Sequence, residues 1–365
     1  MKKFLKAVWI FIPLVAAALM YFLLPFFPSV AEYVFSRGLF KVLTVPIGFV
    51  TSLIPVSLTE LLVVLALPLA VFLVVLLVRK LKSSENRKRT AVKAARGVCA
   101  ALSIACFMYM LGHGANFYRY PMAQLMELDT SQKTAEQLYA VCCELAQNAA
   151  REREGLATDE NGCVSFNVSV FEELTRTESG YKALREDYPF LWTGTWRQKP
   201  VLLSEQWSYT LIVGMYFPFF SECNVNTAQP DYAIPYTASH ESAHSRGFAR
   251  EDECNFLAFL SCINSEYGEF RYSGYMEAYK HCSNALYKYD KELWAAANQY
   301  VTDGMRADFA ADNRFIDAHR GKVQQAASAA NDTFIKAQGV EAGTLSYNQV
   351  TALILAYYEK VWSTE

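Results

Sequence analysis

Three long runs without a charged side chain constrain this chain most, and all of them lie in its first third. They cover residues 7–27, 61–78 and 97–112. A helix of about 20 apolar residues crosses the roughly 30 Å hydrocarbon core of a bilayer. The second run contains Pro68, which a spanning helix tolerates. The runs predict three transmembrane helices at the start of a multi-pass membrane protein, with membrane lipid as a partner.

A fourth apolar stretch, residues 42–58, is also uncharged, but Pro46, Gly48 and Pro55 interrupt it. We expect an interfacial or re-entrant segment here, because irregular backbone at membrane depth is tolerated only where protein or water covers it. If this stretch crossed the membrane instead, everything after residue 112 would move to the opposite side.

The basic residues predict an orientation. Lys2, Lys3 and Lys6 precede the first run, and eight lysines and arginines lie between the second and third runs against one acid, Glu85. Cytoplasmic loops of membrane proteins carry the excess of Lys and Arg. We therefore expect the N-terminus and the basic loop in the cytoplasm, and residues 115–365 outside it, at the plasma membrane.

The two parts of the chain also differ in net charge. Residues 1–96 hold 13 basic and 3 acidic side chains, whereas residues 97–365 hold 21 basic and 33 acidic ones. An acidic domain repels phosphate groups, so we expect neither nucleic acid nor anionic lipid as its main partner.

The segment His240-Glu241-Ser242-Ala243-His244 carries the clearest chemical signal. Residues four apart lie on one face of a helix, so His240 and His244 can bind one metal ion. Glu241 then lies beside that ion, where a carboxylate can take a proton from water. This is the His-Glu-x-x-His signature of zinc peptidases, with Zn²⁺ as the cofactor and Glu241 as the catalytic base. The alternative is an amphipathic helix whose histidines make structural hydrogen bonds.

A catalytic zinc ion takes three protein ligands and keeps one position open. Gly247 can end the helix after the second histidine, and acidic residues follow at 251–253. If a second helix begins there, Glu251 and Asn255 share one face. We therefore predict Glu251 as the third ligand, with Asn255 bonded to a ligating histidine. Glu253 remains the alternative ligand.

Residues 251–255 resemble the Glu-x-x-Ala-Asp/Asn helix that supplies the third ligand in glutamate-type zincins. The segments 217–226 and 240–256 are similar to a bacterial membrane family catalogued as domain of unknown function 3810, and the likeness runs along nearly the whole chain. That family looks like a branch of the zincin metallopeptidases, so the resemblance implies a zinc site but no particular substrate. Two features depart from zincins: the gap from His244 to Glu251 is short, and Cys223 and Cys254 stand where alanines are expected.

Residues 210–225 are rich in strand formers and predict a small β-hairpin ahead of the motif. In zincins such a strand pairs with an extended substrate, whereas the alternative is a core hairpin without a ligand. Residues 271–275 and His281 either stabilise an oxyanion or have structural roles only.

The predicted fold is mainly α: three N-terminal transmembrane helices (the membrane region, 1–114) precede a mostly helical, zincin-like extracytoplasmic domain at 115–365. Its helices are expected at 134–154, 170–188, 276–298, 309–338 and 347–362, and its cysteines as small buried side chains rather than disulfides. The predicted function is a membrane-anchored zinc metallopeptidase that hydrolyses a peptide or an envelope protein. The alternative is a non-catalytic zinc-binding sensor that signals across the membrane.

Overall fold

The chain is mainly helical in a computed structural model that describes residues 8–131, 133–192, 197–338 and 347–364. One small sheet of three strands completes this part of the protein. Ala7, the first residue of the first predicted span, lies outside the described residues, as do Lys2, Lys3 and Lys6.

Four helical stretches of the described chain are long and apolar enough to cross a membrane. Three of them overlap the predicted spans: Trp9–Phe26, which contains α2 (Ile12–Leu23), then α5 (Leu58–Ser83) and α6 (Arg87–Gly112). The fourth, Pro28–Ser52, joins α3 (Pro28–Val30), the π-helix η3 (Ala31–Leu39) and α4 (Phe40–Ser52). Most of the stretch 42–58 is therefore helical, with Pro46 inside the helix. Its location at the membrane interface stays a prediction.

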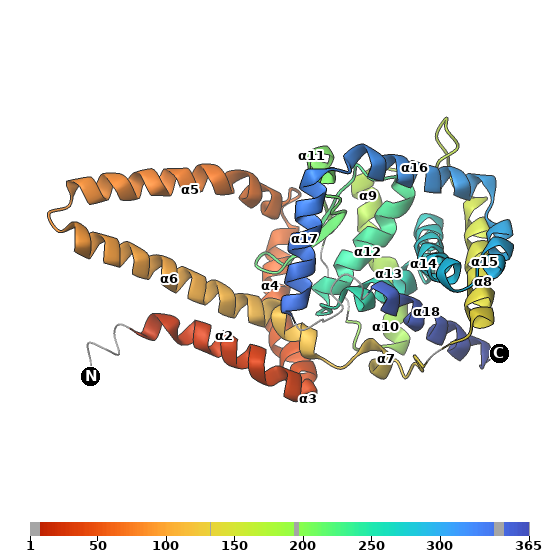
Figure 1. The fold of residues 1–365 in the computed structure, drawn as a ribbon, viewed down its shortest axis with the longest axis horizontal. Helices are drawn as coiled ribbons and strands as arrows, with labels where there is room; N and C mark the ends of the chain where they lie inside the picture. Colours follow the sequence, from red (N-terminus) through yellow and green to blue (C-terminus); the bar gives the residue numbers. More distant parts are fainter. Residues whose placement is uncertain (1–7, 132, 193–196, 339–346, 365) are drawn as a thin grey trace.

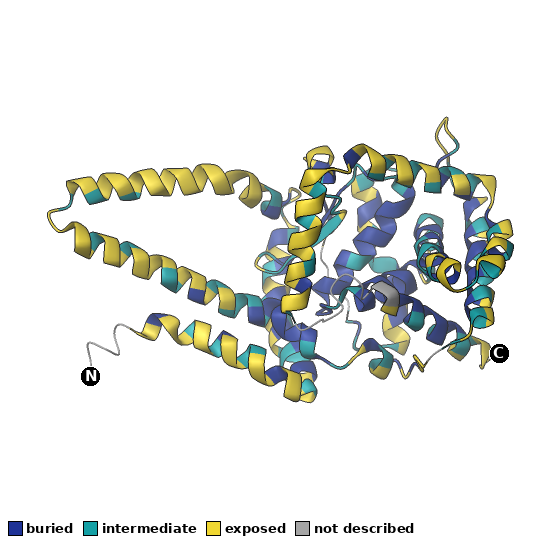
Figure 2. Cartoon of the chain, viewed as in Figure 1, coloured by how far each residue is buried: buried dark blue, intermediate teal, exposed yellow. Residues whose placement is uncertain are grey.

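Figure 1 shows α5 and α6 as an antiparallel pair that extends away from the rest of the protein, with α2 beside α6. The start of α2 and the turn between α5 and α6 lie at the same end, farthest from the helical domain. In contrast, α4 runs across this direction, along the boundary with that domain. Nearly all apolar side chains of α5 are exposed (Figure 2), which is the pattern of a surface that lipid covers.

The helical domain packs around α14 (Gly268–Tyr289), which contacts α8 (Ala135–Arg153), α13 (Glu251–Ile263) and α18 (Tyr347–Trp362). The helix with the histidine motif, α12 (Ile234–Ser245), packs on α13, on α14 and on the sheet. Both α12 and α13 are buried on nearly every side, so the motif lies inside the domain. The other helices are α7 (Met122–Leu125), α9 (Val170–Thr175), α10 (Glu178–Asp187), α11 (Ser204–Ser208), α15 (Lys291–Ala297), α16 (Asp303–His319) and α17 (Lys322–Ala337).

Two predicted helices match closely, 134–154 with α8 and 347–362 with α18. A capping box between Thr134 and Gln137 starts α8 where the sequence predicted. Other predicted helices are divided. The prediction for 276–298 starts too late, since α14 begins at Gly268, and it runs through most of α14 into α15, because Asp290 stops the first helix and caps the second. Similarly, 170–188 forms α9 and α10, and 309–338 forms α16 and α17.

The sheet contains β1 (Lys199–Pro200), β2 (Gly214–Phe217) and β3 (Glu222–Val225) in the order β1-β3-β2. Strands β2 and β3 are antiparallel, as the predicted hairpin requires, and β1 adds a parallel pair that the sequence did not predict. Within the described residues, the second edge of β2 pairs with no strand. The hairpin packs against α12, beside the histidine motif.

A buried polar network joins the sheet to the start of α5. Glu222 on β3 accepts hydrogen bonds from the backbone N–H groups of Leu58 (3.2 Å) and Thr59 (2.9 Å). The Lys199 ammonium group forms an ion pair with Glu222 and donates to the carbonyl of Thr51 at 2.9 Å. A buried charge is costly unless it is paired. The network therefore holds the sheet where α4 ends and α5 begins.

Candidate metal centre

Three side chains of the motif region converge on one point. His240 Nε2 lies 3.2 Å from His244 Nε2 and 3.2 Å from Glu251 Oε2, and His244 Nε2 lies 3.7 Å from Glu251 Oε1. A tetrahedral zinc ion with bonds of about 2.0–2.1 Å separates its ligand atoms by about 3.3 Å. The spacing of these three groups fits such an ion, and they form the one group of this kind within the described part of the chain.

The chain brings the three groups together by reversing direction between α12 and α13. Gly247 takes a φ of 84°, a left-handed conformation that favours glycine. Glu251 then opens α13 as its first residue. This is the glycine-ended pair of helices that the sequence predicted.

Each histidine has a hydrogen-bond acceptor on its other nitrogen. His240 Nδ1 lies 2.8 Å from Asn255 Oδ1, and His244 Nδ1 lies 2.9 Å from the carbonyl oxygen of Phe248. These acceptors place the proton on Nδ1 and leave the lone pair of each Nε2 directed at the convergence point. Asn255 thus occupies the supporting position that helical spacing predicted for it.

Glu253 points away from this centre. Its carboxylate accepts a hydrogen bond from the N–H of Met122 at 2.7 Å and forms an ion pair with Arg250 at 2.8 Å. Of the two carboxylates that the sequence left open as a third ligand, the structure places only Glu251 beside the histidines.

Glu241 lies beside the group, buried against β2. Burial raises the pKa of its carboxyl to about 8, against the opposing charge of His240 and a weaker contribution from the backbone N–H of Tyr216, which donates to it. Its Oε2 atom has no hydrogen-bond partner among the described residues. A buried oxygen without a partner has capacity for a water or substrate proton.

The charge states of two of the three convergent groups, His244 and Glu251, suit a cation. Burial lowers the pKa of His244 to about 4, so its imidazole is neutral and can act as a ligand. Burial opposes ionisation of Glu251, but the hydrogen bond from His240, with a smaller electrostatic contribution from the neighbouring His244 ring, outweighs burial and lowers the pKa of Glu251. The same partnership raises the pKa of His240 against the effect of burial, so a cation that binds here would displace a proton from this ring.

A histidine that sequence reasoning missed also reaches the centre. His113 directly follows α6, and its ring centroid lies 5.7 Å from that of His244 and 5.8 Å from that of Tyr216. Its Nδ1 is buried and has no hydrogen-bond partner within the described residues. Burial lowers its pKa to about 3, so the ring is neutral. Nothing in the sequence indicated that His113 belongs to this site, because it ends an apolar run 127 positions before His240.

The residues suggested for an oxyanion contact have structural partners instead. Arg271 forms an ion pair with Glu152 at 2.8 Å, and the Tyr272 hydroxyl donates to Asp308 at 2.6 Å. In the described part of the chain, no hydrogen bond joins His281 to the three convergent side chains.

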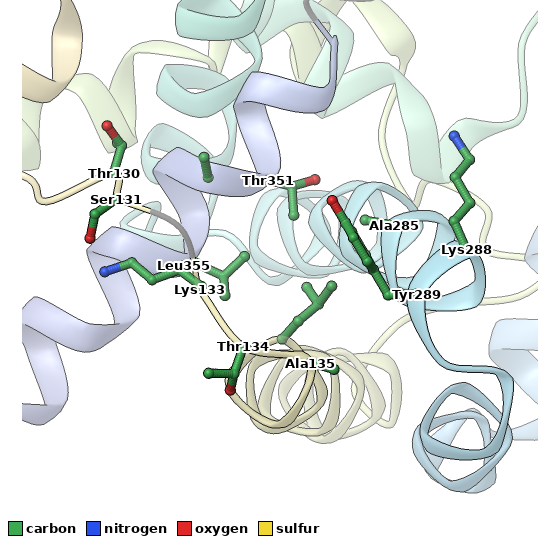
Figure 3. A pocket seen from close by; sticks show the side chains of 12 residues that line it. Thr130, Ser131, Lys133, Thr134, Ala135, Ala285, Lys288, Tyr289, Thr351 and Leu355 are labelled. Carbon is green, nitrogen blue, oxygen red and sulfur yellow. The ribbon is translucent and has the colours of Figure 1, made fainter.

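A separate cavity lies between α8, α14 and α18 (Figure 3). Among the described residues, its wall carries hydroxyl groups and two lysines, Lys133 and Lys288, and no histidine, cysteine or carboxylate. Lys133 is neutralised by an ion pair with Glu359. The described wall of this cavity therefore lacks the usual side-chain ligands of a metal ion.

The fold and the site together define a mainly helical protein with apolar helices near its N-terminus and three buried or half-buried side chains that could hold a metal ion. The sequence matches the family described as "Protein of unknown function (DUF3810)" over residues 35–355, and the chain belongs to that family. No curated protein and no solved structure matches it.

Proposed function

We propose that this protein is a membrane-anchored, zinc-dependent metallopeptidase of the zincin type. One observation carries the proposal: the two Nε2 atoms of the motif and the Glu251 carboxylate converge at tetrahedral spacing, with the Glu241 carboxylate alongside. If the two histidines had only a structural role, neither the Glu251 carboxylate nor the buried, unpartnered Glu241 oxygen would be required beside them.

His240, His244 and Glu251 would hold the ion. Bound zinc would polarise the peptide carbonyl and lower the pKa of water. Glu241 takes a proton from the attacking water and passes it to the leaving amine. Asn255 keeps the His240 ring oriented while this happens.

The unpaired edge of β2 is the proposed binding strand for the substrate. Asn226 donates its N–H to the carbonyl of Val213 at 2.8 Å, so Val213 belongs to a hydrogen-bonded pair with β3. Such pairs alternate along an antiparallel ladder, which leaves the backbone groups of Gly214 and Tyr216 facing outward. The Tyr216 N–H reaches Glu241 on that side. An extended peptide paired with this edge would pass directly by the proposed base.

The arrangement of the apolar helices supports an extracytoplasmic domain. The basic residues of the α5–α6 turn and the start of α2 share one end, opposite the domain (Figure 1). With that end in the cytoplasm, the domain faces the cell envelope. A peptide or an envelope protein is then the accessible class of substrate.

The test uses the full chain purified in detergent, with metal content and cleavage of casein as readouts. We expect about one zinc ion per chain, as a three-ligand catalytic site requires. Glu241→Gln should retain the metal and lose the cleavage, whereas His240→Ala should lose both. A wild-type protein without zinc, or one that cuts casein no faster than Glu241→Gln, contradicts the proposal.

The network between the sheet and α5 favours a second candidate, a zinc-binding sensor. Glu222 connects the strand beside the site to the backbone of Leu58 and Thr59, so a ligand on the sheet would act directly on a membrane helix. Bound zinc without turnover of any peptide is the result that favours the sensor.

A further inference from the structure

The candidate metal centre lies at the level where the apolar helices meet the helical domain. Helix α6 ends at Gly112, and the next residue, His113, has its ring against His244. On another side of the site, Phe40 of α4 is fully buried and packs on the Gly247 turn, where a Cβ would lie 3.2 Å from its ring. The centre is thus separated from two apolar helices by a single layer of side chains.

The turn between β2 and β3 lies at that same level. A Cβ on Gly112 at the end of α6 would be 3.7 Å from the Pro218 side chain, and Thr51 near the end of α4 donates to the Phe220 carbonyl at 3.0 Å. Glu222, the first residue after the turn, caps the start of α5. Two apolar helices therefore end at this turn and a third begins there.

The turn itself carries a cluster of apolar aromatic side chains. The ring of Phe217 lies 5.4 Å from that of Phe219 and 5.3 Å from that of Phe220. Phe219 is 39% exposed despite its size. An exposed apolar cluster beside the ends of apolar helices suits contact with lipid. This cluster and the three helix ends place the bilayer surface at the β2–β3 turn.

The unpaired edge of β2 consequently runs from Glu241 to the membrane. Gly214, at one end of the strand, touches Glu241, and Phe217, at the other end, opens the turn. Glu241 lies beside both Gly214 and the N–H of Tyr216, so at about 3.3 Å per residue it is about 3–10 Å along the strand from the turn. A peptide paired with this edge would reach the bilayer surface within about six residues of the bond beside Glu241.

We infer that the substrate is a polypeptide anchored in the membrane, cut in the extended segment next to its own membrane span. This inference rests on the proposed peptidase function and names the substrate class of that site. A chain that leaves the bilayer in extended form enters the β2 edge directly. A soluble protein would have to insert an unfolded loop between the sheet and the lipid, which costs the entropy of ordering that loop.

The experiment uses the full-length zinc-loaded protein in proteoliposomes with three reporters that share one unfolded casein segment. In the first reporter the segment directly follows a single transmembrane helix. In the second a folded, protease-resistant domain separates the same helix from the segment. The third carries the segment without an anchor. Glu241→Gln sets the background for each, and mass spectrometry maps the cut bonds.

The first reporter should be cut at least about tenfold faster than the free segment, with cuts within about ten residues of the span, a gain of the size that tethering produces. The second reporter keeps the tether but holds the segment away from the bilayer. Because the inference requires proximity to the bilayer, this reporter should be cut only at the rate of the free segment. Equal rates for the first and second reporters, or cuts spread along the segment, overturn the inference and leave the peptidase proposal standing. Cleavage of all three reporters at the Glu241→Gln background rejects the peptidase proposal itself.

Discussion

A Cβ atom on Gly214 would lie 2.3 Å from Oε1 of Glu241. Real Cβ atoms do not approach an oxygen so closely, so the strand can touch the proposed base only because this residue is glycine. The contact connects two parts of the chain, the edge of β2 and the helix with the histidine motif, at the point where the chemistry is proposed to occur.

Gly214→Ala should displace the Glu241 carboxylate without touching the three proposed ligands. We expect cleavage to fall about a hundredfold, the usual cost of moving a catalytic group by about 1 Å, while zinc content stays at the wild-type level. Gly321→Ala is the matched control, because a Cβ there meets nothing within 4 Å. Metal analysis and casein cleavage check both variants. A Gly214→Ala protein with normal turnover would show that Glu241 does not act from its present position.

Asn255→Ala should weaken metal binding through its effect on His240. The ring would lose the acceptor 2.8 Å from its Nδ1 and with it the fixed tautomer. Loss of such a supporting partner typically lowers metal affinity by about 10–100-fold. Zinc titration against a competing chelator measures the change. Asn255→Asp keeps an acceptor oxygen and should remain near wild type; equal losses in both variants would contradict this role.

The buried pair between Glu32 and Arg119 should contribute strongly to stability. Arg119 donates from Nε and Nη2 to the two carboxylate oxygens, each at 2.8 Å, and from Nη1 to the carbonyl of Gly247. Glu32→Gln leaves the buried positive charge of Arg119 without a negatively charged partner. We expect this change to lower the free energy of unfolding by about 3–5 kcal/mol. Thermal unfolding in detergent checks this value. The double variant with leucine at both positions buries no charge, so its free energy of unfolding should fall by less than that of Glu32→Gln.

Glu173 should make stability depend on pH. Its side chain is fully buried, and burial raises the pKa of its carboxyl to about 7, against the opposing charge of Arg176. Because the folded-state pKa is above the ordinary 4.5, the folded state loses stability as pH rises from 5 to 8. At about 1.4 kcal/mol per pKa unit, the loss amounts to about 3 kcal/mol.

Glu173→Gln removes this titration. The stability of the variant relative to wild type should therefore improve between pH 5 and pH 8, as measured by unfolding at both values. A difference between the two proteins that does not change with pH would show that Glu173 titrates normally.

Labelling with a membrane-impermeant maleimide tests the predicted orientation. Ser84 lies in the turn after α5, and Glu154 is an exposed residue just after α8. Ser84→Cys should react only after the cell membrane is permeabilised, whereas Glu154→Cys should react on intact cells. The parent chain, with its own cysteines, gives the background. The opposite pattern would place the proposed active site in the cytoplasm.

Local spacing in the sequence was sufficient for several features of this protein. The two histidines four apart, and the separate pair Glu251 and Asn255 four apart, each predict a shared helical face, and the structure has both on helices. The three uncharged runs likewise identify apolar helices, because hydrophobicity over about 20 residues is a property of the segment alone. In each case the relevant physics acts within one or two helical turns.

Only the tertiary structure decided how these segments meet. It brought His113 to His244, placed Gly214 against Glu241, laid α4 across the other apolar helices and turned Glu253 toward Met122 instead of the site. It also divided three predicted helices, those expected at 170–188, 276–298 and 309–338. These contacts join residues that are far apart in the chain, so they depend on how whole helices and strands pack against one another. The spacing of residues within one segment determines only which of them share a face, and it does not determine that packing.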